Sequence, residues 1–199
     1  MPKPVIVVSG LPRSGTSMMM QVLVAGGMAF LSDGHRQANE NNPKGYYELE
    51  KVKQLAKDSS WISDAEGKAI KVISMLLYEL PVDRPYKVIF VIRNMKEILA
   101  SQRIMWQRLN PGKETLEDEL MAKHYQKHVD KLKRWLSDQA HMNVLYCNYN
   151  TTLTNPGAQM RLQMIQSGGR APQARPMVPL REPAGPRMAP EKAATEQGT

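Results

Sequence analysis

An apolar run that leads into a glycine-bounded turn is the feature that most constrains this chain. Residues 5–8 are Val-Ile-Val-Val, and Gly10 and Gly15 follow them five positions apart. A buried strand, a turn and a helix start in this order direct several backbone N–H groups and the positive end of the helix dipole to one point. We therefore expect a phosphate-binding loop here, and the alternative is a strand–helix turn that binds no ligand.

The residues of this loop restrict the kind of phosphate ligand. The glycine spacing matches the G-x-x-x-x-G-K-[ST] loop of nucleotide-binding proteins, but Thr16 stands where that loop has its lysine. In ATP and GTP enzymes this lysine reaches the β- and γ-phosphates, so a loop without it suits a ligand with fewer charges. Arg13 is the nearest cation, and its planar fork suits phosphate or sulfate oxygens. Hydroxyl donors come from Ser14, Thr16 and Ser17.

A second apolar run, residues 88–92, ends in Arg93. Such a run is typical of a strand buried on both faces of a parallel sheet, and open α/β sheets bind ligands at the C-terminal ends of their strands. Asn94 can cap the helix that follows, and Ser101 lies on its second turn. Taken alone, Arg93 would be read as a strand-end arginine that pairs with a carboxylate. Beside the loop at residues 10–17, it indicates phosphate binding.

These two segments resemble the donor-binding motifs of sulfotransferases, which use 3′-phosphoadenosine 5′-phosphosulfate (PAPS). Residues 12–17, Pro-Arg-Ser-Gly-Thr-Ser, resemble the 5′-phosphosulfate loop of that family. Residues 88–101 resemble its 3′-phosphate motif, in which a strand ends in Arg and a Ser follows eight residues later, as Arg93 and Ser101 do. The resemblance covers roughly residues 4–150. Within the family, the chain most resembles the small bacterial sulfotransferase-like proteins.

The resemblance implies in-line transfer of a sulfuryl group from PAPS to a hydroxyl or amine of a small-molecule or glycan acceptor, without a metal. Arg13 and the loop amides would stabilise charge on the leaving phosphate. Lys71 resembles the strand lysine of cytosolic relatives, and its alternative is a solvated lysine. The donor-binding residues implied are Pro12, Arg13, Ser14, Gly15, Thr16, Ser17, Arg93 and Ser101.

A general base must accept the proton of the acceptor, and the sequence leaves several candidates for it. Many cytosolic relatives have a histidine two residues after the strand lysine, where this chain has Ile73. Other relatives use a carboxylate after the first helix, and a loop carboxylate is otherwise simply solvated. The candidates in the polar loop are Asp33, His35, Glu40 and Glu48, of which Glu40 and Glu48 are preferred. Tyr46 and Tyr47 beside them line the acceptor site or pack the loop down.

Alternating segments predict an α/β fold, a P-loop-containing three-layer structure with a central parallel sheet flanked by helices. The strands are expected at residues 4–9, 69–73, 87–92 and 143–147. The helices are expected at residues 16–26, 48–59, 75–80, 95–108 and 115–139. Residues 16–26 are apolar nearly all round, which favours burial. The last helix should carry one apolar face, formed by Leu116, Leu120, Val129, Leu132 and Leu136.

Composition changes near residue 155. Half of the 14 prolines and no aromatic residue lie from Pro156 onward. Such a segment buries too little apolar surface to offset its ordering entropy. We therefore expect a sulfotransferase-like P-loop domain at residues 1–155 and a disordered Pro/Arg/Ala-rich tail at residues 156–199. Relatives continue with further helices, so a truncated or frame-shifted C-terminus that reduces affinity and activity is an open alternative.

The net charge and the number of cysteines limit which binding partners and which cellular compartment we expect. The net charge of +8 suits an anionic ligand, and the scattered Lys and Arg residues without interleaved aromatics disfavour nucleic acid. One cysteine, no apolar run of about 18 residues and no signal peptide predict a cytoplasmic chain without a membrane span. His124 and His128 lie four apart but have no evident third ligand, so no metal site is expected.

Three classes of function remain, and a sulfotransferase leads. A P-loop kinase is second, because the loop lacks its lysine and the strand at residues 87–92 ends in Arg93 rather than an aspartate for Mg²⁺. A catalytically inactive nucleotide-binding relative is third, because Ile73 replaces the histidine and the C-terminus is atypical.

Overall fold

A sheet of four parallel strands forms the centre of the computed structural model, which describes residues 2–34, 42, 45–113 and 117–155. The strand order is β2-β1-β3-β4, so the strand that leads into the glycine loop lies inside the sheet. Val88 pairs with Val7 on one side and with Val144 on the other. The strands are β1 Val5–Gly10, β2 Ala69–Lys71, β3 Tyr86–Ile92 and β4 Met142–Asn148.

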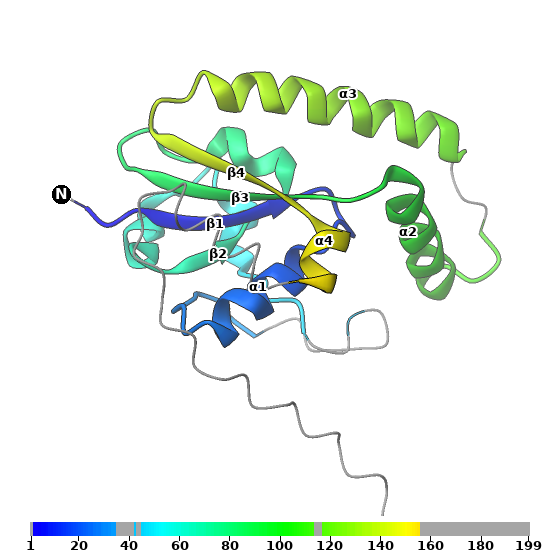
Figure 1. The fold of residues 1–199 in the computed structure, drawn as a ribbon, viewed down its shortest axis with the longest axis horizontal. Coiled ribbons are helices and arrows are strands. Elements are labelled where there is room, and N and C mark those ends of the chain that lie inside the picture. The colour runs from blue at the N-terminus through cyan, green and yellow to red at the C-terminus, as the bar shows by residue number, and fades with distance from the viewer. Residues whose placement is uncertain (1, 35–41, 43–44, 114–116, 156–199) are drawn as a thin grey trace, which may run out of the picture.

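Helices cover both faces of this sheet, which confirms the predicted three-layer α/β, P-loop-containing fold. The α-helices are α1 Thr16–Ala25, α2 Met95–Leu109, α3 Asp118–Ser137 and α4 Tyr149–Thr154. Three 3₁₀ turns join them, η1 Glu50–Gln54, η2 Ser60–Ala65 and η3 Ser74–Glu79. Helix α3 runs along one side of the sheet, α1 lies on the other side, and α2 stands beside the strand ends (Figure 1).

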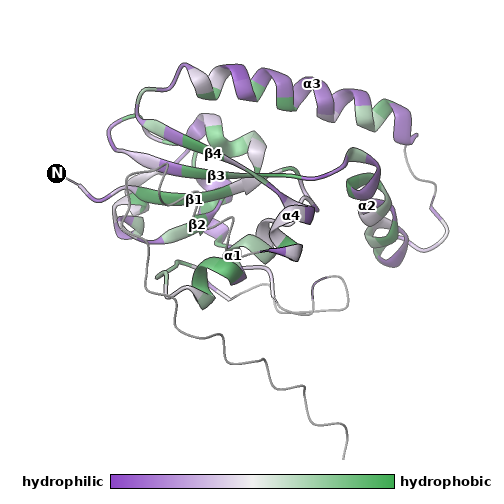
Figure 2. Ribbon diagram, in the orientation of Figure 1, coloured by the Kyte–Doolittle hydropathy of each residue, from purple (hydrophilic) through white to green (hydrophobic). Residues whose placement is uncertain are grey.

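Alternate residues of the strands enter two separate cores, because successive side chains in a strand point to opposite faces. Val7 belongs to the core that contains Leu132 and Leu136 of α3, whereas Val8 belongs to the core that contains Met19 and Met20 of α1. Figure 2 shows hydrophobic residues along β1 and α1, whereas β4 combines hydrophobic and hydrophilic residues. Burial on both faces explains why β1 reads as an unbroken apolar run in the sequence.

Three predicted elements differ from the structure in type or length. The expected helix at 48–59 is only the 3₁₀ turn η1, and the Asp58 carboxylate begins a separate turn by accepting hydrogen bonds from the N–H and hydroxyl of Ser60. Such local side-chain bonds compete with helix formation. Strand β2 ends at Lys71 rather than residue 73, because the chain then turns into η3, which is 3₁₀ and not α-helical.

Two further differences concern the C-terminal half. Helix α4 was not predicted, because its Asn and Thr residues have low helix propensity, but the Asn148 side chain caps it by accepting from the N–H of Thr151. On α3, Leu132 and Leu136 are buried as expected, but Leu120 is 49% exposed. A helix of 20 residues is about 30 Å long, so its first turns extend beyond the sheet.

The predicted tail at 156–199, together with Glu40, His35 and Leu116, lies outside the described residues. The division of the chain at residue 155 therefore stays a prediction. Across the described part of the chain, no helix is both long and apolar enough to cross a membrane.

We predict that Leu132→Ala lowers the free energy of unfolding by about 2–5 kcal/mol, the usual cost of a cavity at a fully buried leucine. Urea denaturation followed by circular dichroism measures this loss. Leu120→Ala on the same helix is the control and should cost less than about 0.5 kcal/mol, because its side chain is exposed. Equal losses would show that α3 does not pack as described.

Candidate functional site

The glycine loop closes tightly at the end of β1. Gly10 has a φ of 155°, and a Cβ there would overlap the Ser14 hydroxyl and lie 2.8 Å from the carbonyl oxygen of Val91. Gly15 has a φ of 105°, and a Cβ there would overlap the ring of Tyr149. Both glycines are therefore required by close approach of other groups, and Gly15 leads directly into α1.

Ser14 lies beneath the loop and not on its open side. Its side chain is 1% exposed, and its Oγ has no hydrogen-bond partner among the described residues. Its N–H donates to the carbonyl of Leu11 at 3.0 Å, which closes the turn. Ser14 therefore shapes the loop, whereas Gly15, Thr16 and Ser17 border the open space.

Contacts join the two motifs that the sequence singled out. Arg13 has a left-handed backbone with a φ of 71°, and its Nε donates to the Ser101 hydroxyl at 2.9 Å. Arg93 Nη1 donates to the carbonyl of Arg13 at 3.1 Å, and Gln102 Nε2 donates to the carbonyl of Pro12 at 3.0 Å. Arg93 at the end of β3 and Gln102 in the middle of α2 thus hold the loop by its backbone, and Ser101 contacts the site through Arg13.

Arg93 is itself held by two neighbours. Its Nε donates to Glu97 at 2.8 Å, and this hydrogen bond, with another from Asn150, lowers the pKa of the Glu97 carboxyl below its usual value. The guanidinium carbon lies 4.2 Å from the centroid of the Tyr149 ring, a cation–π distance. Arg93 therefore keeps a defined orientation at the edge of the site.

Sequence reasoning missed Tyr149. This residue follows β4 directly, as Arg93 follows β3, and the carboxyl ends of parallel strands meet at one edge of the sheet. Its position directly after the last predicted strand could have identified it as a site residue. Its ring lies against both Gly15 and Arg93, so it connects the glycine loop with the end of β3.

A lysine and a carboxylate from distant segments meet beside the loop. The Nζ of Lys71, on β2, lies 3.2 Å from Glu48 Oε1, and Lys71 is only 8% exposed. The same Nζ also donates to the carbonyl of Tyr46 and lies 3.5 Å from the Ser17 hydroxyl. Of the other base candidates, Asp33 accepts the N–H of Glu50 at 2.5 Å and so serves to hold the chain.

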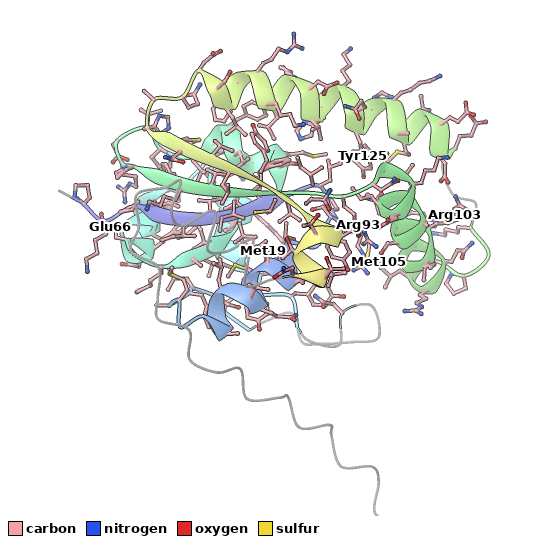
Figure 3. All side chains as sticks on the ribbon, in the orientation of Figure 1. Met19, Glu66, Arg93, Arg103, Met105 and Tyr125 are labelled. Carbon is pink, nitrogen blue, oxygen red and sulfur yellow. The ribbon has the colours of Figure 1, made fainter. Side chains whose placement is uncertain are left out.

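A cavity of about 370 Å³ brings these groups together. Arg93, which follows β3, and Met105, on α2, both border this cavity (Figure 3). The predicted residues that line it are Pro12, Arg13, Gly15, Thr16, Ser17, Glu48, Lys71 and Arg93. Residues on its wall that were not predicted as site residues include Asn42, Ile73, Met105 and Tyr149.

The cavity suits an anionic ligand. Arg13, Lys71 and Arg93 supply positive charge, and the N-terminus of α1 adds its dipole without any acidic residue in the first turn. Among the described residues, no group of three His, Cys, Asp or Glu side chains is placed to hold a metal ion. His128 lies on α3 and contacts the Ser74 hydroxyl at 3.0 Å.

In a comparison with protein families, the model described as "Sulfotransferase domain" matches residues 3–164. Among solved structures, the chain is similar to the sulfotransferase domain from the curacin biosynthetic pathway, with 15% identity, a TM-score of 0.48 and coverage of 85% of this chain and 75% of that one. It is similar to mouse sulfotransferase SULT7A1 complexed with PAP, with 17% identity, a TM-score of 0.46 and coverage of 85% and 59%.

A third similar structure is the sulfotransferase domain from the Synechococcus PCC 7002 olefin synthase, with 14% identity and a TM-score of 0.46. The alignment covers 86% of this chain and 75% of that one. A search of curated proteins finds no match to this chain.

We predict that Gly15→Ala weakens binding of adenosine 3′,5′-bisphosphate at least about tenfold, because the positive φ and the overlap with Tyr149 cost about 1–3 kcal/mol and displace the loop. Isothermal titration calorimetry measures this change. The matched control is Gly112→Ala, which has a φ of 76° but no atom within 4 Å of its Cβ, and should leave affinity unchanged. Similar affinity losses in both variants would contradict the role of Gly15.

Proposed function

This chain belongs to the sulfotransferase family, and we propose that it transfers a sulfuryl group from PAPS to a hydroxyl or amine of a small-molecule or glycan acceptor. One observation carries the proposal. The two phosphate motifs, Lys71 and Glu48 border the same cavity, although they come from four separate segments of the chain. Donor-binding groups and a candidate base thus face one space, as transfer between two substrates requires.

The contacts support a division of the donor site into two parts. The loop N–H groups, Thr16, Ser17 and the N-terminus of α1 form the part for the 5′-phosphosulfate. Arg93 and Ser101 form the part for the 3′-phosphate, and Arg13 contacts Ser101 across the boundary between them. Arg13 therefore lies where it can donate to either end of the donor.

The reaction would proceed by attack of the acceptor oxygen or nitrogen on sulfur, with cleavage of the bond between sulfur and the 5′-phosphate oxygen. Glu48 would take the proton of the acceptor, so that the products are the sulfated acceptor and adenosine 3′,5′-bisphosphate. Lys71 and Arg13 would stabilise the negative charge on the departing phosphate. Lys71 Nζ, 3.2 Å from the Glu48 carboxylate, also holds this base at the cavity.

We predict that Arg13→Ala weakens binding of adenosine 3′,5′-bisphosphate about ten- to hundredfold, because a hydrogen bond to a charged group contributes about 1.5–3 kcal/mol. Isothermal titration calorimetry, with ATP and Mg²⁺ as the competing ligand, measures this loss. If the wild-type protein binds ATP more tightly than the bisphosphate, a kinase would be the better assignment. If it binds neither ligand, no working donor site is present.

The matched control for Arg13 is Lys96→Ala, which removes a positive charge from an exposed residue near the same motif but outside the cavity lining. It should change the affinity less than about twofold, because exposed charges are well screened. An equal loss in both variants would attribute the effect to net charge and not to the loop.

We predict that Glu48→Gln lowers the turnover number about a hundredfold or more, the usual contribution of a general base, while affinity for adenosine 3′,5′-bisphosphate stays within about twofold. Release of the bisphosphate from PAPS is measured with four acceptor probes, namely phenol, decanol, glucosamine and a tyrosyl peptide. Glu50→Gln is the control, because Glu50 is exposed and pairs with Lys53. Wild-type turnover in Glu48→Gln would exclude Glu48 as the base.

A further inference from the structure

Tyr47, which lies between the cavity residues Tyr46 and Glu48, has an unusual backbone. Its φ is 53°, and Arg13 is the other non-glycine residue with a positive φ among those described. The left-handed region is unfavourable for residues with a Cβ, and a bulky side chain there calls for an explanation. Tyr47 is not among the described residues that line the cavity, so direct contact with a ligand does not supply one.

The backbone turn at Tyr47 makes its two neighbours meet one ammonium group. Lys71 Nζ donates to the carbonyl oxygen of Tyr46 and, at 3.2 Å, to the carboxylate of Glu48. In an extended strand, successive side chains point to opposite faces and the backbone carbonyls lie near the plane of the sheet. The carbonyl of one residue and the side chain two positions later would then not reach the same ammonium group. The left-handed residue between them turns the chain so that both oxygens reach Lys71.

Hydrogen bonds on both sides of Tyr47 hold the turn in place. The carbonyl of Tyr46 also accepts from the Ser17 hydroxyl at 3.2 Å. The carbonyl of Glu48 accepts from the Ser32 hydroxyl at 3.0 Å and from the N–H of Asp33 at 3.3 Å. Since both flanking residues are anchored, the residue at position 47 has to adopt the conformation that joins them.

The side chain of Tyr47 is anchored too. Its ring packs edge to face on Phe30, with the centroids 5.5 Å apart and the planes at 68°. Phe30 is joined to the sheet through a bridge to Ala69 of β2, two residues before Lys71. The ring contact therefore ties the turn to the strand that carries the lysine, and offsets part of the cost of the backbone conformation.

We infer that Tyr47 is a positioning residue for the reaction, because its left-handed backbone, held by the ring contact with Phe30, directs the Glu48 carboxylate to Lys71 in the cavity. This inference rests on the proposed function, in which Glu48 is the general base. It assigns to the backbone at Tyr47 the placement of Glu48, although Tyr47 itself is not among the described residues that line the cavity.

The decisive comparison is between Tyr47→Gly and Tyr47→Ala, since both remove the ring but only glycine adopts a positive φ without a steric cost. We expect Tyr47→Gly to keep about tenfold more turnover than Tyr47→Ala, the factor that corresponds to the steric cost of the left-handed region. Tyr47→Phe, which retains the ring, should stay within about twofold of the wild type. Turnover is measured as release of adenosine 3′,5′-bisphosphate from PAPS, with the four acceptor probes and with water alone.

Two control measurements distinguish a positioning role of Tyr47 from general damage to the fold. Affinity for adenosine 3′,5′-bisphosphate should stay constant in all three Tyr47 variants, because Tyr47 is not among the described residues that line the cavity. At Lys51, an exposed residue of η1 with no positive φ, the usual order should hold, with Lys51→Gly no more active or stable than Lys51→Ala. Turnover of Tyr47→Ala equal to or above that of Tyr47→Gly would overturn the inference.

The experiment also distinguishes failure of the inference from failure of the proposed function. Wild-type protein that releases no bisphosphate with any probe would overturn the proposed function. The free energies of unfolding of the variants would then still test whether the fold requires a left-handed backbone at position 47. If it does, Tyr47→Gly should be more stable than Tyr47→Ala. The reverse order of stability would overturn it, whatever the activity.

Discussion

The hydrogen bond from the Arg93 guanidinium to the carbonyl of Arg13 is the contact on which the arrangement of the site depends. It joins the end of β3 to the loop after β1, two strands that are neighbours in the sheet. Gln102 repeats this connection one residue earlier in the loop, and its side chain is in turn held by the Tyr125 hydroxyl of α3 at 3.1 Å. The loop is thus supported by the sheet and by two helices, which preserves a backbone shape that the residues of the loop would not adopt alone.

The parts of the fold that were predictable from the sequence are those that depend on local pattern. Unbroken apolar runs indicated β1 and β3, and the turn with Gly10 and Gly15 indicated the start of α1. The helix expected at 48–59 failed, because the side-chain hydrogen bonds of Asp58 with Ser60 end one turn and begin another there. Such competition between local hydrogen bonds is decided by packing of the whole domain, which periodicity does not report.

The site shows the same division. Arg13 was identified within the glycine loop, Arg93 at the end of an apolar run and Lys71 from the family resemblance. All three line the cavity. Tyr149 and the left-handed backbone at Tyr47 were not identified, since each follows from contacts between segments far apart in the sequence. Glu48 was one of several candidates in a polar loop, and its pairing with Lys71 distinguishes it from Asp33, which bonds to the backbone instead.

The contact between Gly15 and the ring of Tyr149 has a consequence for how the chain acquires its structure. Gly15 of the glycine loop and Tyr149, whose ring covers it, lie near opposite ends of the described sequence. Closing so long a segment costs chain entropy before the contact contributes, and proteins rich in such distant contacts fold slowly. During synthesis, the loop stays uncovered until β4 has left the ribosome and joined the sheet. The conformation of the loop is therefore among the last features of the molecule to form, although its residues are among the first to be made.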